Sequence, residues 1–376
     1  MNKRIDALAE QLAQNGLDWA VLNPGPSLRY LTGLNFHLME RPVVVLISSN
    51  GQVKIILPEL EQAKVAELSF AAEIIPFGDD PASWQGVYQG AVAEISAKPL
   101  RVGVEPTGLR FLELDLLRRA LPNAEYVDGS VCLAGLRMRK GDEELKAMRR
   151  AAVIAQTALI RTLKTVKPGQ SELEISAELM VQLFRAGSDA ELPFAPIVST
   201  GPNTANPHAS PTDRRLREGE MLLIDWGAGF DGYFSDITRT FFCGEPNEEM
   251  KRIAVLVEQA NAAARLGGRR GMRAGEVDTL ARGVIAAGGY GEFFTHRTGH
   301  GLGMEAHEPP FIYQGNPLLL EPGMVFTIEP GIYLPGRYGV RIEDDVVVEG
   351  QSLRSLSDLP RGVRRIEEFL AEVHEE

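Results

Sequence analysis

Five residues in the second part of the sequence have side chains that bind divalent cations, and each stands in an apolar or glycine-rich stretch. They are Asp225, Asp236, His300, Glu329 and Glu343. An unpaired carboxylate on a half-buried strand is costly, because burial penalises its charged form. Cations that pair with these groups would remove that cost. Four carboxylates and one imidazole, with no thiolate, form a hard, oxygen-rich set, which favours manganese or cobalt over a structural zinc site.

The two aspartates are predicted to share one face of a β-hairpin. Asp231-Gly232 is a favoured two-residue turn between apolar strands. Direct pairing across this turn places Asp225 opposite Thr238 and gives Asp236 the same side of the sheet. The two aspartates are then diagonal neighbours, with Cα atoms roughly 7 to 8 Å apart. That spacing suits carboxylates that flank or bridge two metal ions held about 3.5 to 4 Å apart.

Glu329 and Glu343 flank a second predicted hairpin, which turns through Leu334–Arg337. Pro330 removes one ladder donor, so this strand is expected to be bulged or to lie at an edge. Because the glutamates are 14 residues apart, a two-residue turn would place them on opposite faces of the hairpin. A bulge or a longer loop is needed to bring them together, and the sequence leaves both possibilities open.

The histidines gather in the same region. Four of the six histidines lie within 100 residues that also hold two of the acids. A lone histidine is more often structural than a ligand, but this clustering favours a ligand role for His300, whose glycine neighbours disfavour a helix. His208 and His307 are candidate helpers. Asp344 and Asp345 are expected to be solvated or to support the neighbouring glutamate.

The elements that must position these residues fall into two regions. The first alternates short apolar strands, such as Val43–Ile47 and Val53–Leu57, with helical stretches, which is typical of an α/β unit. Beyond Arg137, longer amphipathic helices precede the two hairpins. We expect two domains, residues 1–136 and 137–376, in keeping with domain sizes of roughly 100 to 250 residues.

The second region echoes itself at an offset of about 105 residues. Lys167-Pro168-Gly169 opens one helix, and Arg273-Ala274-Gly275 opens another. A glycine then precedes Asp225 by six residues, and another precedes Glu329 by six. The recurring order of glycine, apolar strand and two carboxylates indicates a duplicated helix-plus-hairpin unit. Chance resemblance between two hairpins is the alternative.

Composition limits the partners and the compartment. A net charge of −12 over 376 residues disfavours nucleic-acid or anionic-membrane partners, which are held mainly through Lys and Arg. Two cysteines, 111 residues apart, argue against a disulfide framework and a cysteine metal site. Asp6 and Glu10 stand where a secretory signal needs its apolar stretch, and no run approaches the roughly 18 apolar residues of a membrane span. We expect a cytoplasmic protein.

The five candidate ligands, in this order and at these separations, resemble the metallopeptidase family that includes prolidase, aminopeptidase P and methionine aminopeptidase. The resemblance covers roughly residues 137–376 and implies an α+β pita-bread catalytic domain. The first domain resembles the smaller creatinase-type α/β N-terminal domain. The family's five ligand positions fall on the five residues named above. The resemblance implies two divalent metal ions, manganese first with cobalt or zinc as alternatives, and a homodimer.

The resemblance also implies roles for residues near the ligands. The implied catalytic residues are His208, His307, Glu329 and Arg341. The implied substrate-binding residues are Phe194, Ile197, His208, His307 and Arg341. Arg341 matches an arginine of the proline-specific members and is expected to orient Glu343 or the substrate. The two apolar residues resemble one wall of the family's proline pocket.

The implied activity is hydrolysis of the bond between a residue and a following proline, so the expected partner is a peptide with proline after the scissile bond. Creatinase-like members lack the full ligand set, and methionine aminopeptidases usually lack the first domain. The length favours a dipeptidase, or prolidase. An aminopeptidase P for longer Xaa-Pro-Yaa peptides and a small-molecule amidohydrolase stay open as alternatives. A binding scaffold that keeps its metal for stability is a further hypothesis.

Overall fold

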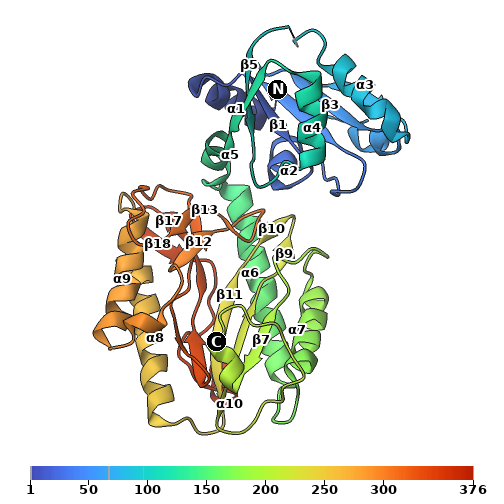
Figure 1. Cartoon of the computed structure of the whole chain (residues 1–376). Coiled ribbons are helices and arrows are strands. Elements are labelled where there is room, and N and C mark those ends of the chain that lie inside the picture. The colour runs from blue at the N-terminus through green and yellow to red at the C-terminus, as the bar shows by residue number, and fades with distance from the viewer. Residues whose placement is uncertain (1, 67, 96, 376) are drawn as a thin grey trace. The chain divides into compact units, whose positions relative to one another are not determined.

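A computed structural model describes residues 2–66, 68–95 and 97–375, and it divides into two compact units, Met1–Arg137 and Met138–Glu376 (Figure 1). Within the described residues, no helix is long and apolar enough to span a membrane. The predicted fold class, a creatinase-type α/β unit and an α+β catalytic unit, is confirmed by the arrangement of strands and helices in each unit.

The first unit is built on a six-stranded sheet in the order β4-β3-β2-β1-β5-β6. Its strands are β1 Trp19–Leu22, β2 Val44–Ser48, β3 Val53–Pro58, β4 Glu73–Phe77, β5 Leu100–Val104 and β6 Ala124–Asp128. Its helices are α1 Lys3–Gln14, α2 Pro26–Thr32, η1 Glu59–Val65, α3 Pro81–Ala91, α4 Phe111–Ala120 and α5 Ser130–Arg137. The two predicted strands, at Val43–Ile47 and Val53–Leu57, correspond to β2 and β3, which pair antiparallel. The apolar strands β1 and β2 are buried throughout, and they form the centre of this unit's core.

Among its described residues, the second unit contains two larger sheets, two two-stranded sheets and five α-helices. The helices are α6 Asp142–Leu163, α7 Glu172–Ala186, α8 Glu248–Gly267, α9 Ala274–Ala287 and α10 Ile366–Glu375, with short turns η2 Gly201–Ala205 and η3 Gly291–Phe293. One sheet has the order β19-β11-β8-β7, formed by β7 Ile197–Thr200, β8 Glu220–Trp226, β11 Ile237–Cys243 and β19 Arg364–Arg365. The other has the order β13-β12-β14-β17-β18, formed by β12 Gly299–Gly301, β13 Glu308–Ile312, β14 Val325–Ile328, β17 Asp344–Glu349 and β18 Ser352–Ser355.

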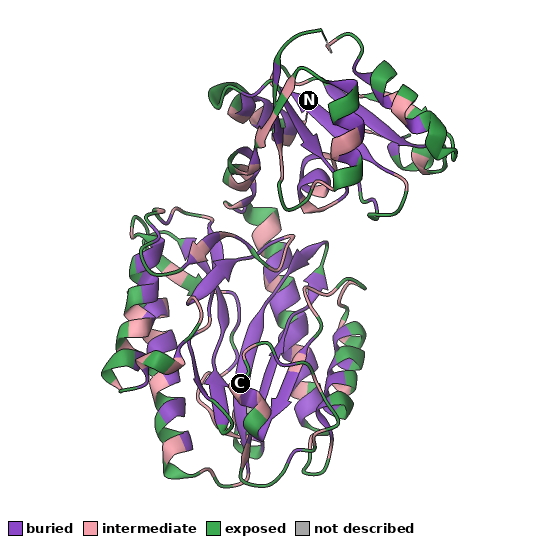
Figure 2. Ribbon diagram, viewed as in Figure 1, coloured by how far each residue is buried: buried purple, intermediate pink, exposed green. Residues whose placement is uncertain are grey.

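The two sheets of this unit lie between two helix pairs, with α6 and α7 on one side and α8 and α9 on the other (Figure 1). The strands are buried along most of their length, while the helices expose their outer faces (Figure 2). Each helix pair packs its apolar face on the nearer sheet and encloses its own core cluster. Helix, helix and strands therefore occur twice in the same order, as the predicted duplication requires.

Local sequence signals define where the helices begin. A capping box begins α7: Ser171 Oγ accepts the Glu174 N–H at 3.1 Å, and Glu174 Oε2 accepts the Ser171 N–H at 2.7 Å. This pairing satisfies two of the backbone donors that a helix start leaves without partners. Gly187 then ends the helix in the left-handed region, with φ of 100°.

The first hairpin has the predicted register. Asp231 and Gly232 both have positive φ, 53° and 74°, as a type I′ turn requires. The turn joins two short strands, β9 Gly229–Phe230 and β10 Tyr233–Phe234. Beyond them β8 pairs with β11, and Asp225 faces Thr238 as predicted.

The second hairpin turns through three residues, Pro335–Arg337, between β15 Gly331–Leu334 and β16 Tyr338–Arg341. Gly331 faces Arg341 there, and further along Ile328 faces Asp344 in the pairing of β14 with β17. Both pairings have the same register. Glu329 and Glu343, which lie between the β14–β17 pair and the β15–β16 pair, therefore face each other. Of the two predicted possibilities, the longer loop is the one present.

Candidate metal centre

All five candidate ligands line one cavity of about 760 Å³ in the second unit. Asp225 lies near the end of β8, and Asp236 directly precedes β11. His300 is the middle residue of β12, while Glu329 directly follows β14 and Glu343 directly precedes β17. Each side chain therefore comes from a strand or from the residue beside one, which fixes its backbone on both sides.

Three of these side chains are buried and converge closely. Asp236, His300 and Glu343 each offer a ligand atom within 4.8 Å of the others. His300 Nε2 lies 3.7 Å from Asp236 Oδ2 and 3.5 Å from Glu329 Oε1. Such separations leave room for a cation between the atoms and are too long for hydrogen bonds.

Two buried oxygens indicate where cations fit. Asp225 Oδ1 and Asp236 Oδ1 are shielded from solvent and accept no hydrogen bond. Buried carboxylate oxygens are normally hydrogen-bonded, so an oxygen without a donor in a polar cavity calls for another positive partner. The donor set of four carboxylates and one imidazole therefore fits divalent metal ions.

The pKa values in the cluster have a common cause. Burial raises the pKa of Asp236 well above its usual value, and the neighbouring Glu343 and Asp225 carboxylates add to the effect. Burial and the Glu329 carboxylate likewise raise the pKa of Glu343. Burial raises the pKa of Glu329 to about 7, although Arg341 opposes the shift. Without a cation, these carboxyl groups hold protons near neutral pH.

The imidazole of His300 is oriented by its surroundings. Its Nδ1 lies 3.1 Å from the Gly301 carbonyl oxygen, and the backbone N–H of His300 donates to Thr327 Oγ1 at 3.2 Å. Burial lowers the pKa of His300, so the ring is neutral. With the proton on Nδ1 donated to that carbonyl, the Nε2 lone pair faces the carboxylates, the arrangement a metal-ligating histidine needs.

Hydrogen bonds across the two sheets hold the acids in place. Thr238 Oγ1 donates to Glu343 Oε2 at 2.7 Å, and the Glu343 N–H donates to the Thr238 carbonyl at 3.1 Å. The Asp236 N–H donates to Asp345 Oδ2 at 3.0 Å. The two halves of the duplicated unit thus meet at the cluster.

Of the two expectations for Asp344 and Asp345, solvation is contradicted, because both are fully buried at 0% exposure. Their side chains point to opposite faces of β17, as neighbours on a strand do. Asp345 accepts the Asp236 N–H on the cavity side. Asp344 pairs with Arg239 and Arg361, which together hold its pKa below the usual value although burial acts to raise it.

Arg341 was expected to orient Glu343 or the substrate, but the proposed ligand that it contacts directly is Asp225. Its Nη2 donates to Asp225 Oδ2 at 2.6 Å. It reaches Glu343 only indirectly, since its Nε donates to Thr238 Oγ1 at 3.1 Å. Nη1 donates to the Tyr333 hydroxyl at 3.0 Å. Arg341 is 2% exposed, so its charge acts inside the cavity wall.

The other predicted residues line the same cavity. His208 and His307 are among them, and the His307 ring centroid lies 4.0 Å from that of His300. Burial lowers the pKa of His307. Phe194 and Ile197 are half-buried and contribute to an apolar part of the wall.

Three residues near the site had no predicted role. His296 and Arg297 line the cavity, and Tyr333 lies behind them. His296 Nε2 lies 2.8 Å from the Tyr333 hydroxyl, and burial lowers the pKa of His296 to about 4. The histidine cluster in the sequence was a usable signal for His296. Tyr333 sits in an apolar strand and gives no such signal.

Comparisons with known proteins agree over the whole chain. The model of metallopeptidase family M24 matches residues 146–350, and the creatinase/prolidase N-terminal domain matches residues 4–139. A probable dipeptidase, PepE, of Mycobacterium tuberculosis is 36% identical over 95% of this chain and 94% of its own. An Xaa-Pro dipeptidase of Lactobacillus helveticus is 32% identical over 96% and 98%.

Solved structures extend this similarity to three dimensions. A dipeptidase of Pyrococcus horikoshii superposes with a TM-score of 0.90 at 36% identity, covering 96% of this chain and 99% of its own. A prolidase of Thermococcus sibiricus superposes with a TM-score of 0.91 at 34% identity, covering 97% and 99%.

Proposed function

This chain belongs to metallopeptidase family M24 and is a hydrolase, and on that premise we propose that it cleaves the peptide bond between a residue and a following proline, as an Xaa-Pro dipeptidase. One observation supports this most: the cavity gathers the full set of five ligand-type side chains together with Arg341. Relatives named as dipeptidases match nearly the whole length of this chain.

In this proposal the cavity holds two divalent ions, manganese in the first place. Asp225, Asp236, His300, Glu329 and Glu343 would hold these ions. When bound, the ions polarise a carbonyl and lower the pKa of a water molecule to near neutrality. A homodimer is the assembly we propose, by analogy with the family.

Glu329 is the proposed general base and acid. Its carboxylate lines the cavity beside the other proposed ligands, where it can accept a proton and return it. The bond before proline is a tertiary amide, and its nitrogen must gain a proton before it leaves. A carboxyl group inside the cavity can deliver that proton without bulk water.

Two histidines and an apolar wall are proposed to hold the substrate. His208 and His307 would bind the carbonyl oxygen and the substrate carboxylate, which stabilises charge as the tetrahedral intermediate forms. Phe194 and Ile197 would pack against the proline ring. Burial keeps His307 neutral, so its ring can donate one hydrogen bond and accept another.

The test is to remove metal with a chelator, add back manganese, and compare hydrolysis of Leu-Pro with that of Leu-Pro-Yaa peptides. Cleavage of the dipeptide alone supports the proposal. Preference for the longer peptides would instead identify an aminopeptidase P. Cleavage of neither would overturn Xaa-Pro hydrolysis and favour a small-molecule amidohydrolase or a binding role.

A further inference from the structure

A buried guanidinium lies behind the proposed ligand Glu343. Arg239 follows Thr238 on β11, so its side chain points to the face away from the cavity. It is 2% exposed, yet each of its five N–H groups has an acceptor. Four of these bonds reach main-chain carbonyls, those of Thr238, Glu343, Leu359 and Pro360, at 2.9, 2.6, 3.0 and 2.8 Å. The fifth reaches Asp344 Oδ1 at 2.8 Å.

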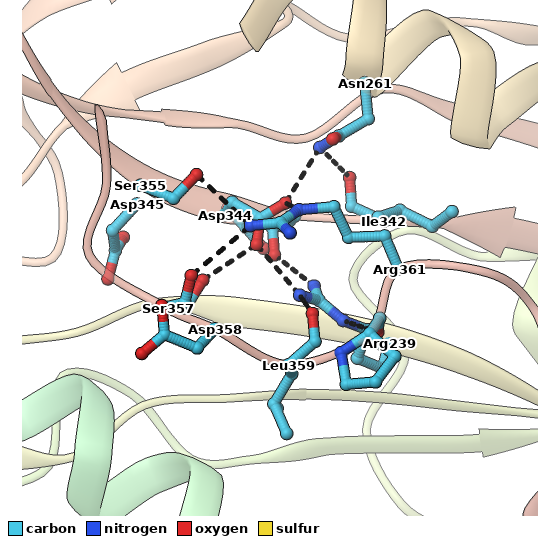
Figure 3. Close-up of polar contacts among 12 residues, drawn as sticks. Arg239, Asn261, Ile342, Asp344, Asp345, Ser355, Ser357, Asp358, Leu359 and Arg361 are labelled. Carbon is cyan, nitrogen blue, oxygen red and sulfur yellow. Dashed lines mark hydrogen bonds and ion pairs between the residues drawn. The ribbon is translucent and has the colours of Figure 1, made fainter. Parts of the chain in front are cut away.

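Asp344 connects this arginine to two further segments (Figure 3). Its Oδ1 also accepts from Ser357 Oγ at 2.8 Å. Its Oδ2 accepts from Arg361 Nε at 2.8 Å and from Asn261 Nδ2 at 3.2 Å. The carboxylate therefore accepts four hydrogen bonds and is fully satisfied while buried, which is the condition for a buried charge to be stable.

Asn261 of α8 reaches the gap in the second hairpin. Its Nδ2 lies 3.4 Å from the Ile342 carbonyl oxygen (Figure 3). The same atom lies 3.1 Å from the Ile328 carbonyl oxygen. These carbonyls belong to the residues directly before Glu329 and Glu343. One amide group thus spans the interval in which the two glutamates face each other.

We propose that Arg239, Asn261 and Asp344, with Ser357 and Arg361, form a positioning cluster that sets the spacing of Glu329 and Glu343 and thereby the affinity of the cavity for divalent cations. The inference rests on the proposed function, because it takes the two glutamates as ligands. The cluster binds the backbone on the far side of the strands and touches neither cation nor substrate.

The physical reason is the repulsion between the ligands. Carboxylates that face each other in a buried site repel, so their backbone must be held if the site is to be preformed. The cluster fixes the peptide groups on either side of Glu343 through Arg239 Nη1 and Asn261 Nδ2. Residues that orient ligands from outside typically change metal affinity by about 10- to 100-fold when they are replaced.

The first experiment measures manganese binding by titration calorimetry on metal-free protein, well below the unfolding temperature. Arg239→Lys keeps the charge but loses the planar fork, and Asn261→Ser removes the bridge. Each is expected to raise the Kd for manganese about 10-fold or more. Ser357→Ala removes one bond to Asp344 and provides a milder variant, with an expected increase of roughly threefold, if the larger changes prevent folding.

Leu179→Ala is the matched control. Leu179 is buried on α7 in a hydrophobic core, so its truncation lowers the melting temperature without removing any hydrogen bond of the positioning cluster. The control should keep its manganese Kd within twofold of the unmodified protein. Equal Kd values in the cluster variants and the control would overturn the proposal and leave Arg239 a purely structural residue.

A second measurement reports ligand geometry directly. The visible absorption bands of cobalt-loaded protein depend on coordination number and symmetry, and they should shift in Arg239→Lys but not in Leu179→Ala. Unshifted bands in every cluster variant would also overturn the proposal. Neither measurement uses a peptide, so dependence of manganese binding on the cluster would stand even if no Xaa-Pro bond were cleaved. If the protein bound none of manganese, cobalt and zinc, the proposal that the positioning cluster sets cation affinity would be overturned.

Discussion

At the scale of single residues, the unusual chemistry lies in Glu329. A carboxyl group with its pKa raised from 4.5 to about 7 by burial is half protonated at neutral pH. Its Oε1 lies 3.5 Å from His300 Nε2, so it shares the cavity with the other proposed ligands. The same side chain is therefore proposed both to bind an ion and to move a proton.

Replacing Glu329 by Gln should separate these two roles. Gln keeps the shape and one ligand oxygen but cannot accept the proton, so kcat should fall roughly 100- to 10,000-fold while much of the bound metal remains. Steady-state kinetics with elemental analysis of the same sample would check this. Full activity in Glu329→Gln would remove this residue from the mechanism.

Manganese binding should depend on pH in a defined direction. The pKa values of Asp236 and Glu343 are raised, and that of Glu329 is raised to about 7, so at lower pH these groups hold protons that a cation must displace. Affinity should therefore rise with pH up to about 7, and binding should release protons. Calorimetry in buffers of different ionisation enthalpy measures that release. Binding that is independent of pH between 5 and 7 would contradict the raised pKa values.

The same shifts determine the stability of the metal-free protein. Glu329 has a folded pKa of about 7 against 4.5 for the ordinary carboxyl, so the folded state binds more protons within that interval. This contribution to stability is fully present below about pH 4.5 and is lost as pH rises through about 7. Metal binding replaces the protons and reverses the trend.

At the scale of elements, the two repeats, α6 and α7 with the first sheet and α8 and α9 with the second, share a feature. In each repeat, a buried acid on the second helix accepts two hydrogen bonds from a threonine. Glu172 of α7 accepts the N–H and hydroxyl of Thr200 at 2.7 and 3.0 Å. Asp278 of α9 accepts the N–H and hydroxyl of Thr298 at 3.1 and 2.8 Å. The recurrence supports the duplication seen in the order of elements.

Glu172 also holds the far end of the segment that carries His208. Its Oε2 accepts the N–H and hydroxyl of Thr212 at 3.0 and 2.7 Å, so one carboxylate ties together both ends of residues 200–212. This segment lines the cavity with Pro207, His208 and their neighbours. Glu172 is fully buried, which makes these bonds inaccessible to water.

Replacing Glu172 by Gln should therefore loosen one cavity wall. The Gln amide presents N–H groups to donors, so stability should fall by about 2 to 4 kcal/mol and KM should rise. Urea unfolding and steady-state kinetics would measure both. Glu178→Gln, on the same helix but only half-buried, is the control and should change little. A stability loss with unchanged KM would show that the wall keeps its shape without Glu172.

The elements also show how far the sequence could predict the site. The aspartate hairpin was predictable because an Asp-Gly turn of two residues fixes the register by itself. The glutamate hairpin was not, because the length of its loop, Pro335–Arg337, decides whether the glutamates face each other. The burial of Asp344 was not predictable either. Its ion-pair partners, Arg239 and Arg361, are distant in the sequence and come close to it only in the folded protein.

At the scale of the whole molecule, the proposed ligands come from both repeats. Asp225 and Asp236 belong to the first sheet, and the other three to the second. The two sheets also share their cores: Val325 and Val347 of the second sheet lie in one core cluster, and Met221 and Phe242 of the first lie in the other. Bound ions would therefore add a further link between two sheets that already share core residues and hydrogen bonds.

Removal of the metal should lower the melting temperature. An ion present at 100 times its Kd stabilises the folded state by about 2.7 kcal/mol, and a chelator removes that contribution. Scanning calorimetry before and after chelation, with manganese restored as the control, would measure the change. An unchanged melting temperature, with loss of metal verified by elemental analysis, would show that the two halves hold together without ions.

The separation of the two aspartates from the last glutamate also sets a sequence in time. Translation adds roughly 5 to 20 residues per second, so Asp225 and Asp236 leave the ribosome seconds before Glu343 does. The first repeat can form its hairpin early, but Asp225 and Asp236 are then present before the other three proposed ligands have been synthesised. The donor set is completed only when nearly the whole chain has been made, so cation loading follows synthesis and does not guide the first repeat's folding.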